Sequence, residues 1–98
     1  MSILTIQEAA DALDYETPDD VPGKVMSIFV PAVDDFLTNA TGKRWSEEPE
    51  INAQAKLVAT ILLVRMFENP GQIEKLSDIT DKNLVALIAQ LTAKARGG

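Results

Sequence analysis

One nearly unbroken apolar stretch in the middle of the chain constrains its fold more than any other feature. Across residues 53–67, only Gln54, Lys56, Thr60 and Arg65 interrupt the apolar side chains. A helix that is apolar on most of its sides has to be covered on most of its sides. This stretch therefore predicts a largely buried central helix around which the rest of the chain is organised.

Three further segments have the spacing of helices, and none has convincing strand alternation. Thr5 and Glu8 form a capping box at the start of the first segment. Proline suits the first turn of a helix, so Pro49 and the nearby Glu47, Glu48 and Glu50 predict where the central helix begins. The four predicted helices span about residues 6–13, 23–41, 49–68 and 81–96.

Pro31 interrupts the second predicted helix. It has no N–H to offer the carbonyl of Ser27, and its ring crowds that turn. The helix is therefore expected to bend, or to end near Phe29 with a new helix starting at Pro31. Gly42 then stops it, because glycine readily adopts the left-handed conformation. The predicted fold class is all-α: a small bundle of four helices, or of five if Pro31 splits the second.

The third predicted helix ends at Asn69-Pro70-Gly71, a strong stop signal. Residues 72–79 are predicted to be a linker with spaced apolar side chains at Ile73, Leu76 and Ile79. Thr80 is predicted to cap the fourth helix. The stripe expected to bury that helix consists of Leu84, Leu87, Ile88, Leu91 and Ala95.

The composition argues against catalysis. The 98 residues, expected to form a single domain over 1–98, contain neither cysteine nor histidine. This removes disulfides, thiolate chemistry, the commonest general base and the commonest metal ligand. No nucleophile elbow or glycine-rich phosphate loop is present. We expect a chain that is not an enzyme and that uses no cofactor and no metal. Its acidic clusters, at residues 19–20, 34–35 and 47–50, are expected to be solvated.

The charge argues against specific binding to nucleic acid. The net charge is −6, and Lys43-Arg44 is the only adjacent pair of cations. Affinity for phosphates depends on clustered cations. The apolar windows are also far shorter than the roughly 20 residues of a membrane span. With no signal-peptide pattern, a cytosolic protein is expected.

The second and third predicted helices have more apolar surface than four short helices are expected to bury. Exposed apolar patches usually mark an interface, which predicts self-association. The alternative is a compact monomer whose loops cover that surface. Trp45 likewise has two readings, as a recognition anchor or as a lid on the end of the second helix.

Four features, in this order along the chain, resemble the head–tail connector (adaptor) family of tailed bacteriophages. They are Leu4-Thr5-x-x-Glu8; Ile28-x-x-Pro31-Ala32-Val33-x-x-Phe36 leading to Ala40-Thr41-Gly42-Lys43 and Trp45; a central helix that ends in Phe67-Glu68-Asn69; and a leucine-rich C-terminal helix. The chain departs from the family pattern at Pro70, where many members have arginine. It also departs at Arg44, where an acid is usual.

The resemblance implies a structural virion protein rather than an enzyme. Such proteins form a closed ring of about a dozen subunits beneath the portal, extend the DNA channel and receive the stopper or tail-completion protein. DNA would pass the acidic ring without specific binding. The implied location is the virion neck, and the bacterial host cytoplasm during assembly. The candidate subunit or partner interface comprises Phe29, Phe36, Trp45, Met66, Phe67, Glu68, Asn69, Leu84, Leu87, Ile88 and Leu91.

Two other functions remain open from the sequence. One is a small helical phage regulator or small packaging subunit that binds nucleic acid. Its only candidate recognition helix is the fourth, with Lys82, Asn83, Gln90 and Lys94. The other is a protein-binding adaptor unrelated to phages.

Overall fold

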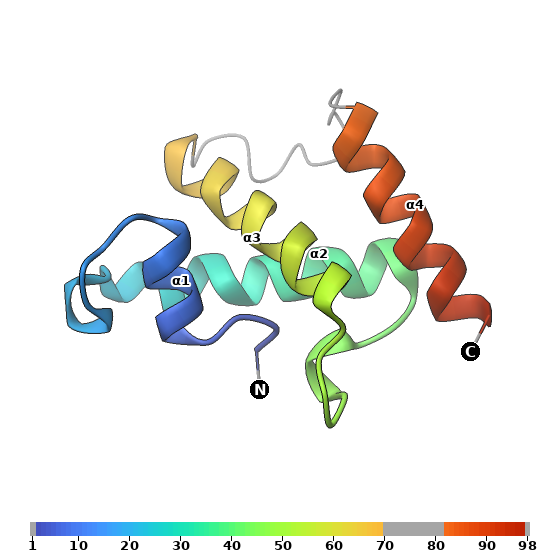
Figure 1. Cartoon of the computed structure of the whole chain (residues 1–98), viewed down its shortest axis with the longest axis horizontal. Coiled ribbons are helices and arrows are strands. Elements are labelled where there is room, and N and C mark those ends of the chain that lie inside the picture. Colours follow the sequence, from blue (N-terminus) through green and yellow to red (C-terminus); the bar gives the residue numbers. More distant parts are fainter. Residues whose placement is uncertain (1, 70–81, 98) are drawn as a thin grey trace.

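The computed structural model describes residues 2–69 and 82–97, which form four α-helices and three shorter helical elements (Figure 1). Among these residues there is no strand, so the all-α prediction is confirmed. The helices α3 and α2 cross near the centre, α1 packs on α3, and α4 packs on both α2 and α3. The α-helices are α1 (Ile6–Ala12), α2 (Val30–Thr41), α3 (Ala53–Glu68) and α4 (Lys82–Gly97), and the shorter elements are the 3-10 turns η1 (Pro18–Asp20) and η3 (Trp45–Glu47) and the π-helix η2 (Val25–Phe29).

The predicted capping box at the start of α1 is confirmed. The Glu8 N–H donates to Thr5 Oγ1 at 3.1 Å, and the Thr5 N–H donates to Glu8 Oε1 at 2.9 Å. Glu8 also pairs with Lys56, which fixes α1 on α3. Partial burial acts to raise the pKa of Glu8, but the hydrogen bonds from Lys56 and Thr5 outweigh it and leave the pKa lowered. The ionised carboxylate therefore stabilises the fold at neutral pH, and that contribution is lost as the pH falls through the lowered pKa.

Helical spacing predicts one apolar face for the first helix, made by Ile6, Ala9, Ala10 and Leu13. Ala9 and Ala10 are buried as this predicts, whereas Ile6 is 44% exposed. The residues that fill the corresponding space are Ile3 and Leu4, which precede the helix and are almost fully buried. The N-terminal segment thus reaches into the core, because Ile3 is held there by a hydrogen bond from its N–H to the Asp34 carboxylate at 3.1 Å.

Pro31 divides the second predicted helix as anticipated, although the chain remains helical throughout. The segment η2 is a π-helix in which the Val30 N–H donates to the Val25 carbonyl, one residue further back than in an α-helix. The helix α2 follows directly, with Pro31 in its first turn. At the other end Gly42 adopts φ 79°, which confirms the predicted left-handed cap.

The central helix begins later than predicted. The Asn52 side-chain oxygen accepts hydrogen bonds from the N–H groups of Gln54 and Ala55, at 2.8 and 3.1 Å, so α3 starts at Ala53 rather than near Pro49. An asparagine at this position satisfies two N–H groups that a proline leaves open. Glu47, Glu48 and Glu50 lie before the helix, and the prediction that they stabilise its positive end is wrong.

The helix α3 is buried along most of its length and forms the centre of the core. Its buried residues are Ala55, Val58, Ala59, Leu62, Leu63 and Met66. They meet Val25, Phe29, Val30, Val33 and Leu37 from η2 and α2, and Leu84 and Leu91 from α4.

This packing corrects the expectation of abundant uncovered apolar surface. In the described residues, the large apolar side chains that remain exposed are Ile6, Ile28, Leu57 and Val85. Each lies on a different helical element. The neighbouring elements therefore cover most of the apolar surface of the second and third predicted helices.

The stripe predicted for the C-terminal helix is confirmed. Leu84 and Leu91 are buried, and Leu87, Ile88 and Ala95 pack partly buried against the core. The predicted linker with Ile73, Leu76 and Ile79, the Thr80 cap and the Pro70-Gly71 stop lie outside the described residues.

Two leucines of α3 provide a direct test of this packing. Leu62 is fully buried, whereas Leu57 is 50% exposed on the same helix. Leu62→Ala should lower the free energy of unfolding by about 2–5 kcal/mol, because it removes buried contacts and leaves a cavity. Leu57→Ala should change it by less than about 1 kcal/mol. Urea denaturation measures both, and equal losses would contradict the described core.

Candidate functional site

The turn between α2 and α3 contains a network of polar contacts around one buried threonine. At its centre, Thr41 is buried and uses its whole hydrogen-bonding capacity. Its hydroxyl donates to the Leu37 carbonyl at 2.7 Å and accepts from the Trp45 indole N–H at 2.9 Å. It also accepts from the Lys43 backbone N–H at 3.3 Å. The segment Thr41-Gly42-Lys43-Arg44-Trp45 is therefore one unit, which we call the TGK–Trp cap.

The indole ring of Trp45 closes the end of α2. It is 2% exposed and packs in the hydrophobic core, which favours the lid over the recognition anchor. The Lys43 Nζ lies 4.7 Å from the centroid of this ring and pairs with Glu48 Oε2 at 3.1 Å. Lys43 thus covers the outer side of the indole through a cation–π contact and a salt bridge. The lid is held from both sides.

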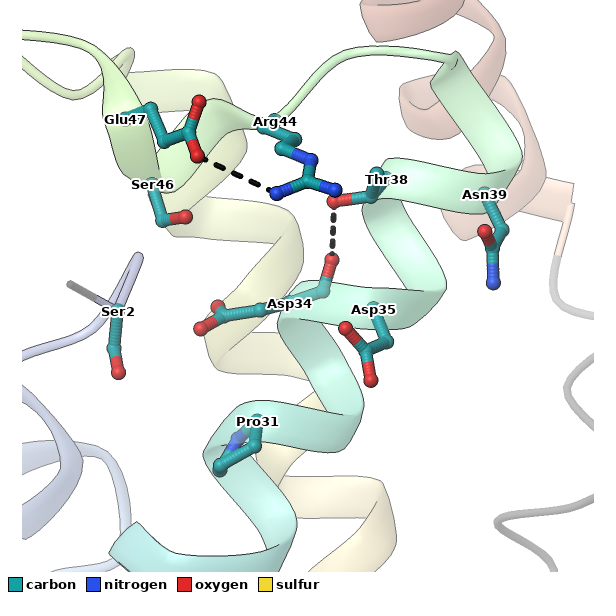
Figure 2. A pocket seen from close by; sticks show the side chains of 9 residues that line it. All are labelled: Ser2, Pro31, Asp34, Asp35, Thr38, Asn39, Arg44, Ser46 and Glu47. Atoms are coloured by element: carbon teal, nitrogen blue, oxygen red, sulfur yellow. Dashed lines mark hydrogen bonds and ion pairs between the residues drawn. The ribbon is translucent and has the colours of Figure 1, made fainter.

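A polar pocket opens beside this cap (Figure 2). It lies between the N-terminal segment, the outer side of α2 and η3. Arg44 reaches from the turn toward α2 and pairs with Glu47 at 3.5 Å, an exposed contact that contributes little stability. The pocket is lined by Ser2, Pro31, Asp34, Asp35, Thr38, Asn39, Arg44, Ser46 and Glu47.

The two aspartates of the pocket differ in their surroundings. Asp35 is exposed, and no cation of the described residues lies within ion-pairing distance of it. Asp34 is half-buried and accepts the Ile3 N–H. Partial burial raises the pKa of Asp34, and the charge of Asp35 raises it further, although the hydrogen bond from Ile3 opposes both. The rim of the pocket is therefore acidic, with three carboxylates against one guanidinium.

The structure places the predicted interface residues in two groups. Five of them are buried within the chain's own core, and their side chains offer no surface in this conformation. These are Phe29, Trp45, Met66, Leu84 and Leu91. The other six, Phe36, Phe67, Glu68, Asn69, Leu87 and Ile88, are half-buried or exposed, and for them an interface remains a prediction.

The ending Phe67-Glu68-Asn69 has an internal role for its aromatic residue. The Phe67 ring makes edge-to-face contacts with Tyr15 at 6.2 Å and with Phe29 at 6.5 Å between centroids. It thereby joins the end of α3 to η2 and to the segment after α1. Glu68 and Asn69 are exposed, and the Asn69 N–H closes the helix on the Arg65 carbonyl.

Sequence reasoning identified the TGK–Trp cap as a motif but missed the pocket. The pocket brings together Ser2, the middle of α2 and the turn, which lie far apart along the chain. The burial of Ile3 and Leu4 brings Ser2 there, and nothing in the sequence before Thr5 predicts it. The pair Asp34-Asp35 was the one indication.

Within residues 2–69 and 82–97, no three histidine, cysteine, aspartate or glutamate side chains gather as a metal site would require. In the same residues, no helix has the length and apolar character needed to cross a bilayer. No protein-family model matches the chain, and neither a curated protein nor a solved structure is significantly similar to it.

The hydroxyl of Thr41 can be tested by Thr41→Val. This change removes the acceptor of the buried Trp45 N–H and should lower the free energy of unfolding by about 1–3 kcal/mol. Thr38→Val is the matched control, because the Thr38 hydroxyl bonds only to the Asp34 carbonyl of its own helix. Urea unfolding followed by the fluorescence of the single tryptophan measures both. Equal effects would contradict the role of the hydroxyl.

Asp34 should make the stability of the protein dependent on pH. Because its pKa is raised in the folded state, its ionisation reduces stability as the pH rises through that pKa. Asp34→Asn keeps an oxygen that can accept the Ile3 N–H and cannot ionise. The variant should therefore gain stability over the wild type near neutral pH and lose that advantage below the usual aspartate pKa. Urea unfolding midpoints of the wild type and Asp34→Asn, at neutral pH and below the usual aspartate pKa, measure this. A stability difference that is the same at both pH values would contradict the raised pKa of Asp34.

Proposed function

We propose that this chain is a non-catalytic structural subunit of a phage head–tail connector ring. In this role several copies assemble beneath the portal, extend the channel through which DNA passes, and present a surface to the stopper or tail-completion protein. The chain acts in the virion neck and assembles in the bacterial host cytoplasm. Its contribution is shape, surface charge and docking.

The observation that carries the proposal is the TGK–Trp cap. Residues 41–45 are one of the more distinctive parts of the connector-like pattern, and they form a single bonded unit at the junction of α2 and α3. The departure at Arg44 is compatible with this unit, because the Arg44 side chain makes none of its hydrogen bonds and reaches toward α2 at the pocket (Figure 2). The cap holds α2 and η3 in a fixed relation, which suits a subunit that must present the same surface in every copy of a ring.

The surface charge also supports the proposal. Residues 2–69 contain twelve acidic and five basic side chains. A channel wall of this charge repels phosphates, so DNA can move past it without adhering.

A second candidate function rests on α4. This helix has three cations and no acid, and Lys82, Asn83 and Lys94 are exposed. Such a helix could bind nucleic acid, as a small regulator or packaging subunit would. Gln90 is less available for this role, because it accepts a hydrogen bond from Gln54 Nε2 at 2.8 Å. A titration with duplex DNA at low salt tests it: saturable, salt-sensitive binding would favour this function over the connector.

The connector proposal is tested by measuring the mass of the protein in solution. Light scattering should show concentration-dependent self-association of the purified chain. In the presence of the portal ring encoded by the same genome, a larger complex should form that contains about a dozen copies of the chain. A portal ring from an unrelated phage is the control. A strict monomer at the highest accessible concentration that also ignores its own portal would contradict the proposal.

A further inference from the structure

The outer side of α4 has no packing partner among residues 2–69 and 82–97. Its residues recur at intervals of three and four, so they line one side of the helix, and all of them are exposed. Two cations stand at its ends, with only small or short apolar side chains between them. The face, which we call the α4 outer face, consists of Lys82, Val85, Ala86, Ala89, Ala93 and Arg96.

Within the described residues, no packing contact explains why this face consists mainly of small apolar side chains. The opposite side of α4, with Leu84 and Leu91, already makes the contacts with α2 and α3. A solvated helix face is normally rich in charged and long polar residues. Here the middle of the face is alanine and Val85, which is 48% exposed. Small side chains let another surface approach the helix backbone closely.

Charge is segregated between α4 and the rest of the chain. The helix has three basic and no acidic residues, whereas residues 2–69 have seven more acidic than basic residues. Part of that acidic surface is hollowed, at the pocket bounded by Asp34, Asp35 and Glu47. Along the exposed side of α2 at this pocket, Pro31, Asp35 and Asn39 follow one another at intervals of four. The α4 outer face is positively charged and has short side chains along its middle. It therefore complements the hollowed, acidic surface at the pocket in both charge and shape.

We propose that the α4 outer face of one subunit docks against the acidic pocket of a second copy of this chain. Lys82 and Arg96 pair with Asp35 and Glu47, and the alanines lie against the exposed side of α2. The inference rests on the proposed function and deepens it, because it names the surfaces that join neighbouring subunits.

The positions of the two surfaces make this contact head-to-tail. The helix α4 lies at one end of the molecule, whereas the pocket lies near the N-terminus and η3 (Figures 1 and 2). Each subunit can therefore use its α4 outer face and its pocket at the same time, toward different neighbours. Contacts of this kind propagate, and they produce a closed ring when the rotation between subunits closes. Contacts between two identical faces would stop at a dimer.

Site-directed crosslinking tests the geometry. The chain contains no cysteine, so introduced thiols are the only ones present. The double variant Asn39→Cys/Ala89→Cys places one thiol at the pocket and one in the α4 outer face. Treatment with a short bismaleimide should yield a ladder of covalent oligomers beyond the dimer. Each single-cysteine variant is the matched control and should yield no more than dimers.

Charge reversal tests the chemistry. Arg96→Glu and Asp35→Lys should each weaken self-association by about tenfold, since each places like charges in contact. Mixing the two variants should restore association, because each reversed surface then faces its complement. Lys24→Glu and Glu16→Lys make the same changes in net charge at exposed positions outside the contact and should have little effect. Lys82→Glu repeats the α4 test at the helix start, where an acid favours the helix.

The outcomes separate this inference from the proposed function. A ladder together with restoration by mixing supports both. Oligomers or portal complexes that form without a ladder and are insensitive to charge reversal overturn the docking contact and leave the connector proposal in place. A chain that is monomeric by scattering, yields no ladder and ignores its own portal ring overturns both. Salt-sensitive DNA binding that is lost in Lys82→Glu and Arg96→Glu, without any ladder, assigns the α4 outer face to nucleic acid instead.

Discussion

The burial of α3 is the constraint on which the rest of the structure depends. A helix with apolar residues around most of its circumference cannot be stable in water until other elements cover it. The N-terminal segment and α1 cover one side, η2 and α2 another, and α4 a third. Each of these elements is short, and α2 and α4 also pack on each other beside α3. Polar interactions fix the orientation of those covering elements. They include the Glu8–Lys56 salt bridge and the hydrogen bonds of the TGK–Trp cap.

The helices and their faces could be predicted because their signals are local. The capping box at Thr5 and Glu8, the left-handed stop at Gly42 and the leucine stripe of α4 each involve residues within a few turns of one another. The start of α3 could not be placed as well, because Pro49 and Asn52 are both acceptable at a helix start. The choice of Asn52 follows from its side-chain oxygen, which accepts two N–H groups of the first turn. Composition near the boundary does not reveal that geometry.

The candidate site shows the limit of sequence reasoning more clearly. The link between Thr41 and Trp45 was visible as a spacing, yet the spacing could not say whether the indole faces solvent or the core. The pocket depends on Ile3 and Leu4 entering the core from outside any helix, which places Ser2 beside α2. The amount of exposed apolar surface was overestimated for the same reason. Helical periodicity identifies the apolar side of a single helix. Whether that side is buried also depends on non-helical segments that fold over it, and these have no periodic signal.

The π-helical turn before Pro31 affects how any relative of this chain would have to be compared with it. A hydrogen bond that spans five residues inserts one residue more than an α-helical turn contains, so the side chains before Val30 are rotated by about 100° relative to an unbroken α-helix. The stretch from Val25 to Thr41 therefore behaves as two phased segments rather than one. An alignment that imposes a single helical repeat across position 30 will assign an outward position to Val25, although its side chain is fully buried. A one-residue deletion at this point in a related chain would replace the π-helical turn by an α-helical one and leave the rest of the fold unchanged.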